Sequence, residues 1–569
     1  MVSQCTCQCR PERSAGGKAR GAQSKDPVEL PEHIANHSPG TFDSVPAHLR
    51  PLGTPLRMTP IANVAQATSR CGQILRNKPP RATTLHRLAA SLAFLLILSL
   101  IAKAEDPHDS YKIITVEPPR DVSLEVSGLA RLPGGKLAVA IRRGEVWIAA
   151  NPYASDGQGI QWSCFATGLH EPLGLTYHNG DLFTTQRSEV TRLRDTNGDG
   201  VADEFLCAAK GWGVSGSYHE YAYGPKFDPA GNMWVTLNCS MGKGAFPERN
   251  WRGYSLRVAP SGEWQPVSGG MRSPCGIGIN PAGDVFYTEQ QGNWNCGGGI
   301  HHIRQGAFHG HAESFAFCDL PGAPFAKPAE TVERVPIAEA MRRMPIYKPA
   351  AVWLPYRKMG MSCTDLVLDD TGGKFGPFAG QFFVGEFTMS QVNRVFLEKV
   401  EGEYQGACFP FLDGFQCAPL RMEFGDDGSM FVGETNRGWN SLGTRSYGLQ
   451  RILWDGHTPF DLKTVEARPG GFHCTFTKPI RKDSAVSAAF RIKSYTYEYH
   501  AEYGGPEIDN QELAVKVKNV ADDGLAVDLA VEGLRETFIH ELSVEGLVSS
   551  DGEPLVHSLA YYTLNRIPK

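Results

Sequence analysis

A short pattern recurs through this chain: an apolar strand, a turn that contains glycine, and a second apolar strand. Its clearest copy lies within Met271–Asn295, where Gly276–Ile279 and Val285–Thr288 flank the turn Asn280–Asp284. A strand, a tight turn with Gly, Asn or Asp and a second strand form the sequence pattern of a β-hairpin. Further copies begin at Gly128, Pro172, Tyr223, Asp365 and Pro419.

The spacing of these copies narrows the fold class. The turn glycines Gly180, Gly231 and Gly283 lie roughly 50 residues apart, which is typical of a four-stranded propeller blade and not of a helical repeat. Six copies predict six blades over residues 105–456. The segment Tyr111–Glu117 precedes the first copy and is a candidate for the strand that completes the last blade.

One gap in the series tests the count of six. Gly283 and Gly380 are separated by about two repeat lengths, which leaves room for a seventh blade. The sequence between His309 and Leu354 lacks the alternation of apolar and polar residues that strands show, and Pro328–Met344 has a helical pattern. We therefore expect an insertion with a short helix here.

The blade pattern stops after Gly456. Six stretches of alternating apolar residues follow, and their spacing predicts a β-sandwich over residues 457–569 that resembles immunoglobulin-like modules. The fold class is therefore all-β, a six-bladed β-propeller followed by an immunoglobulin-like β-sandwich. Four tyrosines of this region either form a sugar-stacking face or are half-buried in a sheet: Tyr495, Tyr497, Tyr499 and Tyr503.

The first 104 residues have a different composition. Residues 1–104 are predicted to be a disordered leader that includes a secretory signal at about 76–104. Basic residues there precede the apolar run Leu88–Ile101, which ends at Ala102-Lys103-Ala104. This predicts a secreted or periplasmic protein; an uncleaved membrane anchor is the alternative.

Composition and cysteine usage restrict the partners. The formal net charge is −5 and no basic run is interleaved with aromatic residues, so nucleic acid is not an expected partner. The even number of cysteines after residue 104 predicts disulfides, with Cys408–Cys417 as the best candidate pair. No Cys-x-x-Cys-His motif occurs, so covalently bound haem is not expected and any electron carrier is a separate molecule.

An acidic loop in the second blade predicts a calcium site. Oxygen side chains alternate along the sequence from 195 to 203, and a glycine permits the sharp turn that wraps such a loop around Ca²⁺. The loop is not an EF-hand, because Leu206 stands at position 12. A metal-free turn is the alternative. The candidate ligands are Asp195, Asn197, Asp199, the Val201 carbonyl and Asp203.

His219 is the candidate general base. It lies just before the predicted innermost strand of the third blade, where the loops of a propeller converge at the mouth of the central channel. Imidazole accepts a proton near neutral pH. The alternative is a histidine whose nitrogens are satisfied by neighbouring loops.

Three motifs in consecutive blades resemble a known family. His219 followed by Phe227–Gly231, the stretch Arg272–Gly278, and the loop Glu289–Asn293 are similar to motifs of the soluble PQQ-dependent glucose/sorbosone dehydrogenases. The resemblance covers roughly Val126–Gly456. It implies that His219 acts as the base, that Arg272 and Ser273 contact the quinone cofactor PQQ, and that the carbonyls of Gln291 and Gly292 hold an active-site Ca²⁺.

The chain departs from this family at three positions. Asn238-Cys239 stands where the family has an aspartate that orients the histidine, the cofactor-binding lysine is missing with only Arg394 nearby, and Arg421 alone replaces Arg-x-Arg. PQQ carries three carboxylates, and each lost charge-assisted bond removes about 1.5–3 kcal/mol. The chain also resembles a broader group of exported bacterial propellers described as membrane-bound dehydrogenases.

Two further sets of residues carry open interpretations. His301, His302, His309 and His311 form either a transition-metal site or ordinary loop and channel histidines. Glu289, Glu386 and Glu434 each follow the second strand of a blade, so they either line one end of the channel or serve blade packing.

The leading hypothesis is an exported oxidoreductase that oxidises a sugar or polyol at the channel mouth and passes electrons to an external acceptor. The alternative is a non-catalytic propeller that binds glycan or protein. A propeller hydrolase or lyase is the third possibility, since a histidine and carboxylates serve either chemistry.

Overall fold

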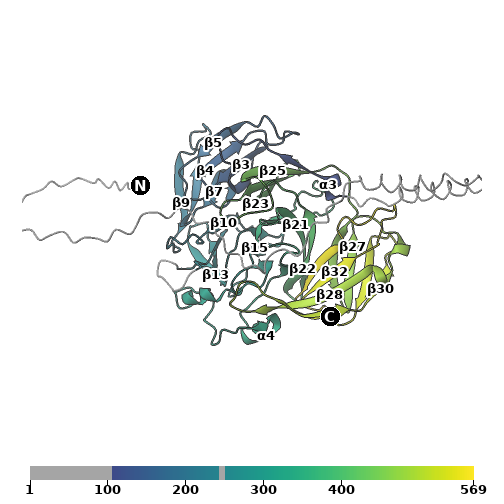
Figure 1. The fold of residues 1–569 in the computed structure, drawn as a ribbon. Helices are drawn as coiled ribbons and strands as arrows, with labels where there is room; N and C mark the ends of the chain where they lie inside the picture. Colours follow the sequence, from purple (N-terminus) through teal and green to yellow (C-terminus); the bar gives the residue numbers. More distant parts are fainter. Residues whose placement is uncertain (1–105, 242–249) are drawn as a thin grey trace, which may run out of the picture. The chain divides into compact units, whose positions relative to one another are not determined.

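The computed structural model describes residues 106–241 and 250–569, all within one compact unit that spans residues 94–569. The leader and signal predicted for residues 1–104 lie outside the described residues. Strands dominate the described ranges (Figure 1). None of the helices in these ranges has the length and apolar character that crossing a membrane requires.

Six antiparallel units of four strands follow one another along the chain. In the first five, the strands pair in sequence order, and the glycine turns of the sequence pattern join the first strand to the second. The first three blades are β2 (Val126–Leu132), β3 (Lys136–Ile141), β4 (Glu145–Ala149), β5 (Trp162–Ala166); β6 (Leu175–His178), β7 (Asp181–Thr185), β8 (Glu189–Arg194), β9 (Glu204–Lys210); and β10 (Ala222–Phe227), β11 (Met233–Leu237), β12 (Tyr254–Val258), β13 (Trp264–Gly269).

The remaining blades complete the set of six. They are β14 (Ile277–Ile279), β15 (Val285–Glu289), β16 (Gly298–His302), β18 (Val352–Leu354); β19 (Cys363–Leu368), β20 (Phe382–Glu386), β21 (Gln391–Val400), β22 (Glu403–Leu412); and β23 (Pro419–Phe424), β24 (Met430–Thr435), β25 (Tyr447–Trp454) with β1 (Tyr111–Thr115).

Strand β1 closes the ring. It pairs antiparallel with β25, from Tyr111 opposite Trp454 to Thr115 opposite Gln450, and so supplies the outermost strand of the last blade. The first strands of the six blades contact one another in a closed series: β2, β6, β10, β14, β19, β23 and again β2. The predicted six-bladed propeller and the predicted closure by the segment at Tyr111 are confirmed.

The gap between the fourth and fifth copies is an insertion inside the fourth blade. Between β16 and β18 the chain forms the 3-10 helix η3 (Ala312–Phe317), the short strand β17 (Val335–Pro336) and helix α4 (Ile337–Arg343). The helix begins later than the helical pattern suggested, because it starts only after Pro336. No seventh blade is present among the described residues.

The C-terminal residues form two layers of strands around a common core. One layer contains β26 (Leu462–Arg468), β27 (Gly471–Phe476), β31 (Ala526–Val531) and β30 (Val515–Val520). The other contains β28 (Phe490–Tyr499), β32 (Phe538–Val544) and β33 (Leu559–Leu564), with β29 (Glu507–Leu513) paired to β28. Buried side chains of both layers, such as Phe472, Val527 and Leu542, meet in one cluster. The immunoglobulin-like assignment of these layers stays a prediction.

This C-terminal region is joined to the propeller by backbone pairing, which the sequence did not suggest. Strand β33 pairs with β22, the outer strand of the fifth blade, so that Cys408 lies opposite Tyr561. Strand β17 of the insertion pairs with β28. One sheet of nine strands therefore runs from the fifth blade into one of the two C-terminal layers (Figure 1).

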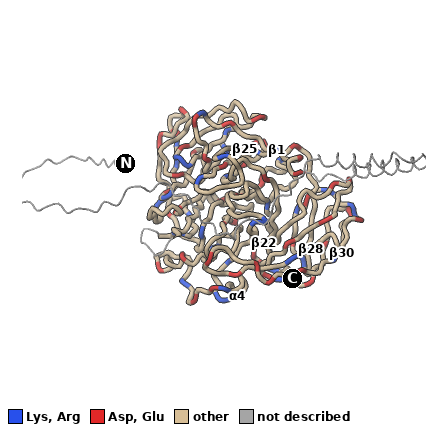
Figure 2. The backbone as a smooth tube through the Cα atoms, viewed as in Figure 1, with Lys and Arg blue, Asp and Glu red and all other residues tan. Residues whose placement is uncertain are grey.

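Charged side chains add to this junction. Lys358 lies 2.9 Å from both Glu507 and Glu541 of the C-terminal strands. The fully buried Arg394 pairs with Asp461 at 3.4 Å and packs between the rings of Phe378 and Phe409. Elsewhere Lys and Arg are interspersed with Asp and Glu along the described chain (Figure 2).

The prediction of disulfides is wrong for the described residues. All ten cysteines there are free. The thiol of Cys408 donates to the Trp353 carbonyl at 3.3 Å, between the fourth blade and β33, whereas the thiol of Cys417 donates to Asn436 Oδ1 at 3.4 Å in the sixth blade. The predicted Cys408–Cys417 pair does not form because the two side chains enter different layers.

The closing strand offers a test of the ring. Tyr111 is 1% exposed, its hydroxyl donates to the Phe375 carbonyl at 3.1 Å, and its ring packs edge-on against Phe411. Tyr111→Ala leaves a cavity between β1 and the fifth blade, so it should lower the free energy of unfolding by about 3–5 kcal/mol. Tyr111→Phe keeps the ring and should cost only about 1 kcal/mol. Urea denaturation followed by fluorescence measures both.

Phe205→Ala is the matched control, because Phe205 is 46% exposed on an outer strand. This change should alter stability by less than about 0.5 kcal/mol. A Tyr111→Ala protein that unfolds at the wild-type urea concentration would show that β1 is dispensable for the ring.

Candidate functional site

A cavity of about 230 Å³ that opens to solvent lies where the blade loops converge. Its walls come from segments that enter the first strand or leave the second strand of the blades, and all six blades contribute. The C-terminal region adds one side chain, Tyr503. The lining includes Arg142, Leu173, His219, Asn238, Arg272, Ser273, Gln290, Phe387, Thr435 and Trp439.

His219 lies in this wall, on the loop that enters β10, with its side chain exposed to the cavity. The ring contacts Tyr218 edge-on at 5.4 Å, and within the described ranges no group forms a hydrogen bond with the imidazole. Partial burial, together with the charges of Arg272 and Arg187, lowers the pKa of His219. The imidazole is therefore neutral at pH 7 and has a free nitrogen lone pair, so the structure does not support the alternative of a histidine satisfied by neighbouring loops.

Arg272 reaches the same cavity from the loop before β14. Its guanidinium Nη1 donates to Ser273 Oγ at 3.1 Å and to the Gln291 carbonyl at 3.4 Å, and Tyr503 stacks over it at 5.2 Å. Among the described residues no carboxylate pairs with this guanidinium. Arg272 is thus a cation available to an oxygen atom of a ligand.

A buried carboxylate fixes the backbone at Arg272. Both oxygens of Glu289 accept main-chain N–H groups, from Arg272 at 2.8 Å and from Ser273 at 2.7 Å. Burial raises the pKa of Glu289 to about 7 against the opposing effect of these hydrogen bonds. The carboxylate anchors the loop from beneath and does not face the cavity.

The two equivalent glutamates, Glu386 and Glu434, are also buried and also accept hydrogen bonds from the protein. Glu386 accepts the N–H of Met361 at 2.7 Å and that of Met389 at 2.5 Å, and Glu434 accepts from the Gln416 amide at 2.8 Å. All three carboxylates are 0% exposed. Of the two interpretations, burial excludes lining of the channel and leaves the packing role: each carboxylate lies at the end of a second strand.

The other two arginines that line the cavity form ion pairs with glutamates. Arg142 pairs with Glu171 at 3.0 Å, and Arg437 pairs with Glu125 at 2.9 Å. Arg421 lies deeper in the channel, where it donates to Cys275 Sγ at 3.5 Å and stacks on Tyr223. Arg394 forms its ion pair with Asp461 and does not line the cavity. Arg272 is therefore the only cavity-lining arginine of the described chain without a carboxylate partner.

The two carbonyls expected to hold an active-site calcium ion accept hydrogen bonds from protein groups. The Gly292 carbonyl accepts the Gly504 N–H at 3.0 Å, and the Gln291 carbonyl accepts from Arg272. A Cβ at position 292 would lie 1.9 Å from Arg272 Nε, so glycine is required where the arginine crosses this loop. Neither Gln291 nor Gly292 lines the cavity. In this arrangement Gln291 and Gly292 do not offer their carbonyls to a calcium ion in the cavity, whereas the Arg272 guanidinium is a group that one carboxylate of a quinone would bind.

Aromatic side chains surround the cavity. Tyr218 is 51% exposed, Tyr503 62% and Trp439 66%, and these are three of the four exposed aromatic side chains among the described residues. Flat apolar faces next to polar groups suit the mixed surface of a sugar ring. The sequence analysis missed Tyr218 and Trp439, because the sequence does not show which aromatic side chains of the loops meet across the channel.

Of the two interpretations of the C-terminal tyrosines, burial in a sheet holds for three of the four. Tyr495, Tyr497 and Tyr499 lie on β28 with exposed fractions of 0–2%, buried against the insertion and the fourth blade. Tyr503 follows the strand and reaches the mouth because residues 503–505 pair with the loop at Gly292 and Cys296.

The acidic loop lies between β8 and β9, away from the cavity. Its side chains accept main-chain N–H groups of the same loop: Asp195 from Gly198 at 2.7 Å, Asp199 from Val201 at 2.9 Å, and Asp203 from Thr196 at 2.7 Å. The Ca²⁺ ligand set of Asp195, Asn197, Asp199, Val201 and Asp203 stays a prediction.

The histidines of the fourth blade are mostly core residues. His301 and His309 are buried against the Tyr287 ring, and burial lowers the pKa of His301 to about 3. His302 lies 3.6 Å from Asp284. His311 differs from these three, since it contacts the Cys239 thiol.

Comparisons with known proteins describe the same part of the chain. Residues 151–434, from the first blade to the sixth, match a family described as a domain of unknown function, DUF7133. No curated protein matches the chain.

Several solved structures are similar to this chain. An oxidoreductase described as a glucose dehydrogenase from Thermus thermophilus is 19% identical, with a TM-score of 0.44, covering 60% of this chain and 100% of its own. A PQQ-bound aldose sugar dehydrogenase from Streptomyces coelicolor is 14% identical, with a TM-score of 0.40 and coverages of 62% and 99%. The apo-form of the soluble aldose sugar dehydrogenase from Escherichia coli is 13% identical, with a TM-score of 0.41 and coverages of 61% and 100%. At such identities and TM-scores the activity of this chain rests on its own residues.

Proposed function

We propose that the cavity at the channel mouth binds a sugar or polyol and that the protein oxidises one of its hydroxyl groups. One observation carries the proposal: His219, Arg272 and three exposed aromatic rings line the same cavity. A base, a cation without a carboxylate partner and apolar faces are the groups that such a substrate needs. With the signal predicted at about 76–104, the reaction would take place outside the cytoplasm.

The roles follow from the geometry of the mouth. His219, neutral at pH 7, takes the proton of the substrate hydroxyl. The guanidinium of Arg272 donates to the oxygen that becomes a carbonyl and stabilises its developing charge. The hydride from the same carbon requires an acceptor, which a quinone bound beside Arg272 would supply, with an external electron acceptor to reoxidise it.

The C-terminal region completes this site in the proposal. Tyr503 and Trp439 hold the sugar ring between them and exclude water from one side of the mouth. We infer that residues 457–569 form an immunoglobulin-like module whose loop at Tyr503 belongs to the binding site.

A second function is favoured by a specific observation. The carbonyls of Gln291 and Gly292 are occupied by protein donors, and Arg142 and Arg437 are paired with glutamates, so the mouth offers little to a tricarboxylate and its calcium ion. A propeller that binds a glycan without changing it needs only the aromatic rings and hydrogen-bond donors.

His219→Ala distinguishes the two functions. If the protein is an oxidoreductase, protein supplied with PQQ should reduce an artificial dye with at least one sugar or polyol of a panel, and His219→Ala should lower the rate by about 10²–10⁴-fold. Sugar binding, measured by calorimetry, should change little. Wild-type protein that binds a sugar but never reduces the dye would support the binding function, and absence of both would reject the site.

Tyr503→Ala tests the contribution of the C-terminal region. Loss of the stacking face should weaken sugar binding by roughly tenfold, corresponding to about 1.4 kcal/mol. Phe205→Ala, which removes an exposed aromatic ring away from the cavity, should leave the affinity unchanged. Equal affinities for wild type and Tyr503→Ala would place the sugar elsewhere.

Arg272→Met tests the electrostatic link to the base. Partial burial and the Arg272 charge lower the pKa of His219, so removal of the charge should raise this pKa toward the ordinary value of about 6.5. In an active enzyme the acid limb of the pH–rate profile should move to higher pH. NMR titration of the His219 ring, assigned by loss of its signal in His219→Gln, measures the shift without substrate.

Arg437→Met is the control for this experiment. Arg437 lines the same cavity, but its charge is not among the causes that lower the pKa of His219. An unchanged His219 titration in Arg272→Met would mean that the two groups do not interact across the cavity.

A further inference from the structure

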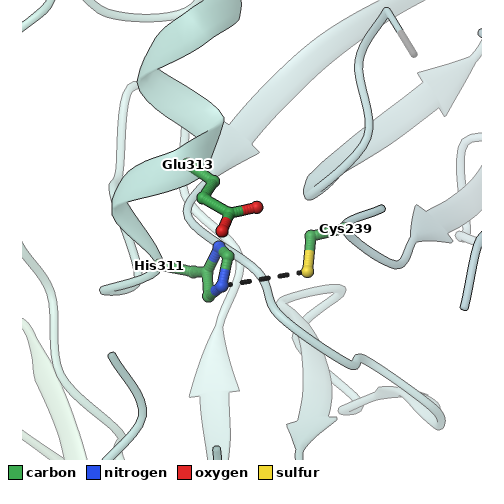
Figure 3. A group of neighbouring side chains, drawn as sticks. All are labelled: Cys239, His311 and Glu313. Carbon is green, nitrogen blue, oxygen red and sulfur yellow. Dashed lines mark hydrogen bonds between the residues drawn. The ribbon is translucent and has the colours of Figure 1, made fainter. Parts of the chain in front are cut away.

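Three potential metal ligands meet beside the channel mouth. Cys239 follows β11 of the third blade, and His311 and Glu313 lie at the start of η3 in the insertion of the fourth blade. The thiol, an imidazole nitrogen and a carboxylate oxygen lie within 4.8 Å of one another, the only such group of three His, Cys, Asp or Glu side chains in the described ranges. Figure 3 shows the His311 ring between the thiol and the carboxylate.

The backbone holds the two buried ligands in place. The Cys239 N–H donates to the Arg272 carbonyl at 3.0 Å, and the His311 N–H donates to the Gly270 carbonyl at 2.8 Å. Both ligands are therefore attached to one short segment, residues 270–272, although they are 72 positions apart. Neither position depends on the orientation of a flexible loop tip.

The distances suit a thiophilic cation. Cys239 Sγ lies 3.8 Å from His311 Nε2. Zinc binds sulfur at about 2.3 Å and nitrogen at about 2.0–2.1 Å, so two such ligands at a near-tetrahedral angle are roughly 3.5–4 Å apart. The pair is thus already spaced for one shared ion, and the Glu313 carboxylate is close enough to supply a third ligand.

The burial of two ligands and the combined charge of all three also favour a bound cation. Cys239 is 3% exposed and His311 2%, whereas Glu313 is an exposed residue. A divalent cation bound to a thiolate, a carboxylate and a neutral imidazole gives a site without net charge, which suits a site with two buried ligands.

We propose that Cys239, His311 and Glu313 bind one Zn²⁺ ion, with loss of the proton from the Cys239 thiol. Three protein ligands leave a fourth position for water. The ion clamps the end of the third blade to the insertion of the fourth. Since both buried ligands are attached to residues 270–272, the clamp also fixes the segment that presents Arg272 to the cavity.

Metal analysis of the purified full chain tests the site. Dialysed wild-type protein should retain one equivalent of zinc, and replacement with Co²⁺ should give a thiolate-to-cobalt charge-transfer band. Cys239→Ser should abolish this band, His311→Gln should remove most of the bound metal, and Glu313→Gln should weaken binding by roughly tenfold. Cys318→Ser, which changes another buried cysteine of the insertion, should retain the full equivalent.

Two results would overturn the proposal. One is wild-type protein that takes up cobalt without a thiolate band or binds neither ion. The other is a full equivalent of metal in both Cys239→Ser and His311→Gln. If these variants fail to fold, the band in wild-type protein still decides, as does a fall in melting temperature when a chelator removes the ion. None of these measurements depends on sugar oxidation, so the two proposals can fail separately.

Discussion

Closure of the ring is the constraint on which the other features depend. Each blade is a twisted four-stranded sheet that cannot bury both faces alone, and only a closed ring gives every blade two neighbours. The last blade obtains its fourth strand from the start of the described chain, through the pairing of β1 with β25. Because the ring is closed, loops that are more than 200 residues apart in sequence, such as those carrying His219 and Trp439, face one cavity.

Buried carboxylates give these loops a defined shape. Glu289, Glu386 and Glu434 occupy equivalent places in three successive blades, and Glu289 and Glu386 each accept several main-chain N–H groups of the segments above them. The cost of burying a charge is reduced by these hydrogen bonds and by a raised pKa. The polar groups that line the mouth are therefore held by buried acidic residues that do not themselves line the cavity.

The repeat could be predicted from the sequence, since a glycine turn between apolar strands is a local signal with a regular spacing. The placement of His219 and Arg272 near the channel mouth followed from that repeat. Contacts that depend on the neighbouring blade could not be predicted in this way. Examples are the pairing of β33 with β22, the position of Trp439, and the meeting of Cys239 with His311. The predicted disulfide was wrong for the same reason. Cys408 and Cys417 are close in sequence, but strand β22 ends between them and their side chains lie in different layers.

Residues 503–505 pair with the loop at Gly292, so both the propeller and the C-terminal region form the wall of the mouth. A propeller cut off after its last blade would keep His219 and Arg272 but would lose one wall of the recess. Conversely, exchange of a few residues in one C-terminal loop would reshape the recess without disturbing any blade. Ligand choice and scaffold integrity can therefore diverge independently among proteins built on this plan.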